Sequence, residues 1–266
     1  MTRMMLTTRT ALMAATLAGI ILGAPMCSLA ADKPLNPLAT AQVANSQGSD
    51  IAARLDKKQY RNVKVSVDQG TATLTGTVEL YQYKADADKR ARKAKGVTAV
   101  RDLIEVAGPV ISDQELQGKL QDKLAYDRVF YGNAFNAITV DVENGAVTLG
   151  GHAVSPFAKD SALTLVSYYP GVKNVADEIE VDPVSSFDNR IRFQVFRSVY
   201  GYPTFTRYAM NPAKPIRISV QNGNVELYGT VDSQGDKDIA FMRANAVPGV
   251  FNVKNYLQVA AQSEKK

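Results

Sequence analysis

Apolar and polar residues alternate along three stretches of this chain, and a short polar turn divides each stretch. In the second stretch, Val140 and Val142 precede the turn Glu143-Asn144-Gly145, and Leu149 lies four residues after Gly145. A period of two predicts strands with one buried face, and Asn-Gly between two such runs is typical of a tight hairpin. We therefore predict a β-hairpin here and at the related phrases DQGTATLTGTV (68–78) and QNGNVELYGTV (221–231).

Nine glycines mark three copies of one repeat. In each copy the second glycine lies 6 residues after the first, and the third lies 20 residues after the second. The copies are Gly70, Gly76 and Gly96; Gly145, Gly151 and Gly171; and Gly223, Gly229 and Gly249. Such regular spacing indicates tandem repeats. We interpret the first glycine as the hairpin turn, the second as a point of close backbone packing or a bend, and the third as a helix stop.

Helices are predicted on both sides of each hairpin. Small or apolar residues lie 9, 5 and 2 positions before the third glycine, as in Ala87, Ala91 and Ala94, which places them on one helical face. Further helical segments precede the hairpins at 49–58, 112–126 and 187–199, and an apolar strand closes each unit. Each unit therefore reads α-β-β-α-β, and we predict an α+β fold of three small tandem domains.

This pattern of positions resembles the BON domain. The shared features are an apolar-x-Val pair before the first glycine, Leu-x-Gly after it, a helix, and a closing strand that begins Gly-Val, and they extend over nearly all of residues 49–260. The resemblance implies a non-enzymatic periplasmic protein, similar to the osmotically induced type, that binds phospholipid surfaces or envelope proteins. Its glycine and apolar motifs are framework features and name no catalyst. Many relatives have two units, whereas this chain has three.

The expected domain organisation follows from the repeat. We expect a signal peptide, a flexible linker, three BON-like domains with an aromatic insertion in the last, and a short tail. Their bounds are 1–30, 31–48, 49–107, 112–182, 187–260 with the insertion at 200–215, and 261–266.

The N-terminus has the features of a secretory signal peptide. Arg3 and Arg9 precede a short apolar core at 11–22, and Ser28-Leu29-Ala30 forms a small-x-small cleavage pattern. The alternative is an uncleaved anchor, but the apolar core is shorter than the roughly 20 residues that span a bilayer. Cys27 is the one cysteine and lies within this segment. We therefore expect a periplasmic protein without disulfides or a lipid anchor.

The net charge and the few residues suited to catalysis or metal binding limit the classes of function that the chain could have. The formal net charge is +5, and residues 1–30 contribute two of the 31 basic residues and no acid. This mild excess is far below that of a dedicated nucleic-acid binder, so we expect no nucleic-acid partner. The one histidine, His152, has no histidine or cysteine partner for a catalytic zinc site. We therefore expect no catalytic residue, metal, cofactor or small-molecule substrate.

The strongest charge feature is the segment KADADKRARKAKG (84–96) on the second helix of the first unit. The candidate residues for an anionic phospholipid surface are Lys84, Lys89, Arg90, Arg92, Lys93 and Lys95. Anionic headgroups attract such clusters by about 1 kcal/mol per basic residue. The alternative is an ordinary solvated helix face, partly neutralised by Asp86 and Asp88.

The third unit carries the insertion YGYPTFTRYAMNPAKP at 200–215. Its aromatic residues are Tyr200, Tyr202, Phe205 and Tyr208. Long irregular loops are often functional, so one interpretation is a loop that binds envelope proteins. The alternative is a packed extension that covers a sheet edge. Two hypotheses follow: a protein that binds phospholipid surfaces, or an adaptor for envelope proteins that uses the insertion and its sheet edges.

Overall fold

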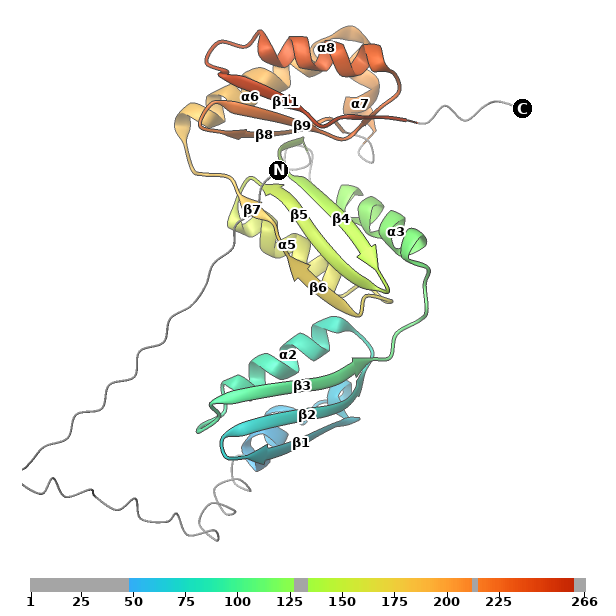
Figure 1. The fold of residues 1–266 in the computed structure, drawn as a ribbon, viewed down its shortest axis with the longest axis vertical. Coiled ribbons are helices and arrows are strands. Elements are labelled where there is room, and N and C mark those ends of the chain that lie inside the picture. The colour runs from blue at the N-terminus through green and yellow to red at the C-terminus, as the bar shows by residue number, and fades with distance from the viewer. Residues whose placement is uncertain (1–47, 127–133, 212–214, 261–266) are drawn as a thin grey trace, which may run out of the picture. The chain divides into compact units, whose positions relative to one another are not determined.

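A computed structural model describes residues 48–126, 134–211 and 215–260 (Figure 1). The expected signal peptide, all but the last residue of the linker, and the tail lie outside the described residues. Across the described ranges, no helix is both long enough and apolar enough to cross a membrane.

Three units with the same order of elements follow one another. The first contains a helix at 48–54, η1 (Lys58–Tyr60), β1 (Val63–Asp68), β2 (Thr71–Val78), α2 (Tyr81–Arg92) and β3 (Ala99–Val106). The second contains α3 (Asp113–Tyr126), β4 (Ala137–Glu143), β5 (Ala146–Ala153), α5 (Pro156–Ser167), β6 (Asn174–Asp177) and β7 (Glu180–Val181).

The third unit is the longest. It contains α6 (Ser186–Tyr200), η2 (Pro203–Phe205), α7 (Thr206–Met210), β8 (Arg217–Gln221), β9 (Asn224–Tyr228), β10 (Thr230–Val231), α8 (Gln234–Asn245), β11 (Asn252–Asn255) and β12 (Gln258–Val259). The predicted α+β fold with an α-β-β-α-β order is therefore confirmed in all three units.

Each sheet is built around the second strand of the hairpin. In the first unit, β2 pairs antiparallel with β1 and parallel with β3, and α2 lies over one face (Figure 1). The other units repeat this order as β4-β5-β6 and β8-β9-β11. Their closing strands break after Asp177 and Asn255, whose side chains accept hydrogen bonds from the backbone two residues on. Among the described residues, the helices of each unit cover one face of its sheet, and we call the other face the helix-free face.

The glycines act as the repeat predicts. At the hairpin turns Asn144 and Gly145 have φ of 53° and 79°, a left-handed pair that favours Asn-Gly. At the second position, a Cβ on Gly76 would lie 2.0 Å from the Asn62 carbonyl oxygen, and one on Gly151 would lie 2.0 Å from that of Ala137. The predicted close backbone packing is confirmed, and no side chain fits at these positions.

The core of each unit lies between its helices and its sheet. In the first unit, Ala87 and Ala91 on α2 are fully buried with Leu74 and Ile104. The small residues allow the helix to lie close to the sheet, as their spacing predicts. In the second unit, the Asp113 carboxylate accepts hydrogen bonds from the turn amides of Asn144 and Gly145 (2.7 and 2.9 Å), which ties α3 to the hairpin.

Candidate functional site

Helix α2 presents its basic residues to solvent because its small residues face the sheet. Lys89, Arg90 and Arg92 lie in its last turn, and Lys93 and Lys95 follow it. Cations at a helix C-terminus interact favourably with the negative end of the helix dipole, so this placement also stabilises α2.

A hollow of about 330 Å³ lies beside this helix in the first unit. It is lined by Arg54, Asp86, Lys89, Arg90 and Lys93, and we call it the basic groove. Arg54 comes from the helix at 48–54 and is not among the residues predicted from the sequence. Four cations and one carboxylate make the groove a candidate site for an anionic group.

Ion pairs occupy some of these cations. Arg54 pairs with Asp50 (3.1 Å), Arg90 with Asp86 (3.3 Å) and Arg92 with Asp88 (2.6 Å), each four residues apart on one helix. Such exposed pairs contribute about 0.3–0.5 kcal/mol each. By contrast, Lys89, Lys93 and Lys95 have no ion pair within the described ranges. Their charges are therefore available to an external anion.

Arg90 is the most constrained cation of the groove. Its guanidinium lies 5.9 Å from the Tyr60 ring centre, and the Tyr60 hydroxyl donates to the Asp86 carboxylate (3.3 Å). Hydrogen bonding with Tyr60 raises the pKa of Arg90, burial opposes this, and Asp86 adds to the increase. Its buried Nε has no hydrogen-bond partner within the described part of the chain.

Lys84 does not belong to this site. Its Nζ donates to the Ile104 carbonyl oxygen (2.7 Å), and Lys159 makes the same bond to Ile179 in the second unit (2.7 Å). Both lysines lie eight residues after the second glycine of their unit, as does Lys237 in the third. Lys84 is therefore a framework residue that fastens its helix to the closing strand. The recurrence of a lysine at this position in all three units is the sequence feature that indicates this role.

The aromatic insertion is also structural. Phe205 is 0% exposed and Tyr208 is 3% exposed, both within the core of the third unit. The Tyr200 hydroxyl donates to the Ile216 carbonyl oxygen (2.7 Å), and burial raises the pKa of Tyr200. Tyr202 packs edge-on against Phe205, with ring centres 5.6 Å apart. These four aromatic side chains are engaged in the fold, which favours the packed extension over a binding loop that would present them to a partner.

Tyr208 shows how the insertion is fixed. Its hydroxyl donates to the Asp236 carboxylate (2.8 Å) and accepts from the Asp232 backbone amide (2.8 Å). Asp236 lies in the first turn of α8 and Asp232 just before the helix, so the insertion fastens the start of α8 to the rest of the unit.

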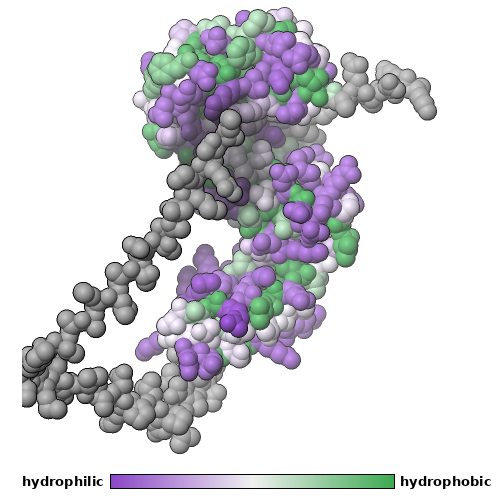
Figure 2. All heavy atoms as spheres, viewed as in Figure 1, coloured by the Kyte–Doolittle hydropathy of each residue, from purple (hydrophilic) through white to green (hydrophobic). Residues whose placement is uncertain are grey.

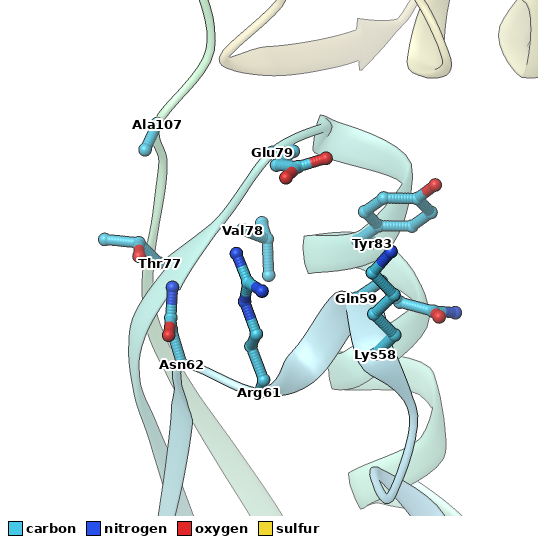
Figure 3. Close-up of a pocket in the computed structure, with 9 residues that line it drawn as sticks. All are labelled: Lys58, Gln59, Arg61, Asn62, Thr77, Val78, Glu79, Tyr83 and Ala107. Atoms are coloured by element: carbon cyan, nitrogen blue, oxygen red, sulfur yellow. The ribbon is translucent and has the colours of Figure 1, made fainter.

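A second hollow of about 330 Å³ lies at the end of the first hairpin (Figure 3). Lys58 and Arg61 line it together with Glu79 and Tyr83, and the close-up shows the Lys58 chain extending toward the Tyr83 ring. It has two cations and one carboxylate, so its excess of positive charge is smaller than that of the basic groove. The described residues include no His, Cys, Asp and Glu group that could hold a metal ion.

His152 lies at a junction between the second and third units. Its Nδ1 is 3.5 Å from an Asp182 oxygen and 3.0 Å from the Gln221 amide nitrogen, and its Nε2 is 3.4 Å from a Glu226 oxygen. The imidazole is surrounded by structural carboxylates, and no hydroxyl or thiol nucleophile is among these contacts. We interpret His152 as a contact residue between units.

The model of the BON domain family matches residues 46–108, 112–183 and 206–261. This chain therefore belongs to the BON domain family. Osmotically-inducible protein Y of Escherichia coli K12 is 24% identical over 208 residues, which cover 74% of this chain and 96% of that protein. The third match begins after α6, although α6 packs on the third unit through the buried side chains of Ile191 and Val195.

Two solved structures show a weak likeness. The C-terminal domain of CdsD, a structural protein of the type III secretion system of Chlamydia trachomatis, is 15% identical with a TM-score of 0.25. The match covers 80% of this chain and 96% of that one. The PrgH periplasmic domain is 9% identical with a TM-score of 0.19, over 76% of this chain and 96% of that one. At these TM-scores the likeness carries no argument about function.

Proposed function

We propose that this chain is a non-enzymatic periplasmic protein that associates peripherally with anionic phospholipid surfaces and supports the cell envelope under osmotic stress. The observation that carries the proposal is the basic groove, in which Lys89 and Lys93, with the neighbouring Lys95, form no ion pair with any described residue. Membership of the BON domain family and the name of the osmotically inducible relative support the envelope and stress part of the proposal.

The charges predict a weak and reversible association. Each basic residue near an anionic surface contributes about 1 kcal/mol, so three free lysines supply roughly 3 kcal/mol. A dissociation constant of 1 mM corresponds to about 4 kcal/mol, so this groove alone gives binding that depends on ionic strength and lipid charge density. Figure 2 shows hydrophobic residues interspersed among hydrophilic ones on the visible face, which fits surface association better than insertion.

The test is co-sedimentation with vesicles of defined composition. The exported form, residues 31–266, is mixed with phosphatidylglycerol or phosphatidylcholine vesicles at low and high salt. We expect binding to phosphatidylglycerol at low salt only. The double variant Lys89→Glu/Lys93→Glu should abolish it, because each reversal replaces an attraction with a repulsion.

The matched control carries the same charge change elsewhere. Lys64→Glu/Lys173→Glu reverses two exposed lysines outside the basic groove. If this control still binds the vesicles, the groove is supported as the binding site. If both double variants lose binding equally, the loss is explained by the change in net charge alone. If the unmodified protein binds none of the vesicles, the lipid proposal is rejected and a partner among envelope proteins is favoured.

A further inference from the structure

The helix-free face of the third sheet contains an arginine that no described residue pairs. Along β8, Ile218 and Val220 point into the core beneath α6, so Arg217 and Ser219 project from the opposite face. Arg217 is directly opposite Tyr228 of β9 in the strand register. It is partly buried, yet no hydrogen bond or ion pair engages its guanidinium anywhere in the described ranges.

A hollow of about 600 Å³ opens beside this arginine. The third unit contributes Arg217, Tyr228 and Tyr256, and the second unit contributes Leu124 and strand β4. We call it the Arg217 hollow. It is the largest of the three hollows described and lies apart from the basic groove, with which it shares no residue.

The charge of Arg217 is poorly compensated. Burial lowers the pKa of its guanidinium, and interaction with Tyr200 opposes this only in part. The fully buried arginine of the same unit, Arg192, shows the usual solution, because its Nη2 lies 3.0 Å from an Asp182 oxygen. Asp141 also lines the hollow but is exposed, and its carboxylate accepts a hydrogen bond from the Gln117 side-chain amide (3.5 Å). Burying a guanidinium without an anion is costly, so an external anion is the natural partner for Arg217.

The walls of the hollow suit an apolar body attached to that anion. Tyr228 and Tyr256 stack with ring centres 5.1 Å apart and planes at 24°, and Tyr256 is 45% exposed, which leaves ring surface free. Leu124 and Ile138 of the second unit also line the hollow and supply aliphatic surface. A ring or short chain can pack between these walls while its charged end meets the guanidinium.

The framework of the repeat does not require this arrangement. Counted from the glycines, Lys64 in the first unit corresponds to Arg217, Thr75 to Tyr228, and Leu103 to Tyr256. Lys64 and Leu103 are exposed. The first unit thus has a solvent-exposed cation and no tyrosine at these positions, whereas the third unit combines a partly buried arginine with two tyrosines.

We propose that the Arg217 hollow binds a small amphipathic anion, whose carboxylate, sulfonate or phosphate group is held by the guanidinium of Arg217 and whose apolar body packs against Tyr256 and Ile138. The planar guanidinium matches such groups with two parallel hydrogen bonds. This function goes beyond membrane association and departs from the sequence-based expectation that the chain takes no small molecule.

Isothermal titration calorimetry with three probes tests both halves of the proposal. The exported form, residues 31–266, is titrated with naphthalene-1-sulfonate, with the neutral 1-naphthalenemethanol and with methanesulfonate. We expect naphthalene-1-sulfonate to bind roughly tenfold to a hundredfold more tightly than either of the others, because only it offers both a charge and a ring. Equal affinity for the neutral compound would overturn the proposal.

The variant Arg217→Met separates a ligand-binding arginine from a structural one. We expect it to lose naphthalene-1-sulfonate binding and to raise the thermal midpoint of the free protein, because an uncompensated charge is removed. Lys64→Met, at the equivalent exposed position, should change neither property. Unchanged binding, or a lowered midpoint or failure to fold in Arg217→Met, would overturn the proposal, whereas Arg217→Lys should retain weakened binding.

Vesicle binding identifies the source of the anion. If Arg217→Met still sediments with phosphatidylglycerol vesicles as the unmodified protein does, the site takes a soluble anion. If vesicle binding falls in parallel, the amphipathic anion is a lipid, and the anion site is still supported. The double variant of the basic groove, Lys89→Glu/Lys93→Glu, should bind naphthalene-1-sulfonate normally. Failure of the membrane proposal can therefore be distinguished from failure of the anion-site proposal.

Discussion

The helix-free faces of the first and third sheets occupy the same positions in the repeat but have opposite environments. Ser66 and Ser219 both lie four residues before the first glycine of their unit. Ser66 is exposed, whereas Ser219 is 1% exposed. On the first face the neighbours are short threonines such as Thr73 and Thr75, and on the third face Glu226 and Tyr228 occupy the equivalent positions.

This difference separates what makes the fold from what the fold is used for. The inward-facing positions and the glycines are alike in both units, because both must pack helices on one face of a sheet. The outward-facing positions are free to change without disturbing that core. In the third unit they have become a polar contact with the second unit, and in the first unit they remain in solvent.

Asp182 is the centre of that contact. This carboxylate, from the end of the second unit, is 2% exposed and accepts hydrogen bonds from Arg192 (3.0 Å), Ser219 (3.1 Å) and Gln221 (3.1 Å). Burial alone would raise the pKa of Asp182, but hydrogen bonds from His152 and Gln221 and the charge of Arg192 together lower it. The first sheet has no counterpart to this network among its described outward residues.

The largest expected effect comes from removing that carboxylate. Asp182→Ala leaves Arg192 buried without its anion, and breaking a buried pair in this way costs about 3–5 kcal/mol. Urea unfolding of residues 31–266 should show this loss, and the third unit should unfold first. Asp68→Ala, an exposed carboxylate on the first sheet, should change stability by less than about 0.5 kcal/mol. Similar losses in the two variants would contradict the distinction between the two faces.

A smaller effect is expected from pH, through His152. Its hydrogen bond with Asp182 raises the pKa of His152; burial opposes this, and the charges of Asp182, Glu226 and Glu180 add to the increase. A raised folded-state pKa gives stability that is complete below the unfolded value of about 6.5 and is lost as pH rises through the folded pKa. Stability should therefore fall as pH rises above about 6.5.

Nuclear magnetic resonance can check this expectation directly. The chain has one histidine, so one imidazole signal reports the folded-state pKa without assignment of others. The variant His152→Gln should remove the pH dependence of unfolding in that window. A folded-state pKa at or below the usual value would contradict the expected contact with Asp182.

Much of the fold was predictable because its determinants are local or repeated. The Asn144-Gly145 turn depends on backbone conformation at two adjacent residues, and the place of Gly76 is marked by its repetition at Gly151 and Gly229. Apolar residues that recur with a period of two or of 3.6 show directly which face of a strand or helix is buried. These signals need no knowledge of distant contacts, and the strands and helices they predicted are confirmed.

The candidate sites were less predictable because they depend on where long side chains end. Lys84 and Lys89 look alike in sequence, but the Lys84 ammonium donates to the Ile104 carbonyl oxygen, whereas Lys89 forms no ion pair with any described residue. Arg54 joins the basic groove from a separate helix. An aromatic segment such as the one around Phe205 has the same amino-acid composition whether it forms a binding loop or packs into a core. Only the three-dimensional packing distinguishes these cases.

The smallest expected effect is also the most closely matched test of the comparison. Ser219→Ala removes a hydroxyl that donates to Asp182 (3.1 Å), and loss of such a bond should cost about 1 kcal/mol. Ser66→Ala is the same change at the same position of the repeat, where the hydroxyl is in water, and should cost less than about 0.5 kcal/mol. Urea unfolding midpoints of the two variants give the difference. If Ser66→Ala proved as costly as Ser219→Ala, the environment of the face would not be what separates the two units, and intrinsic strand propensity would explain both losses.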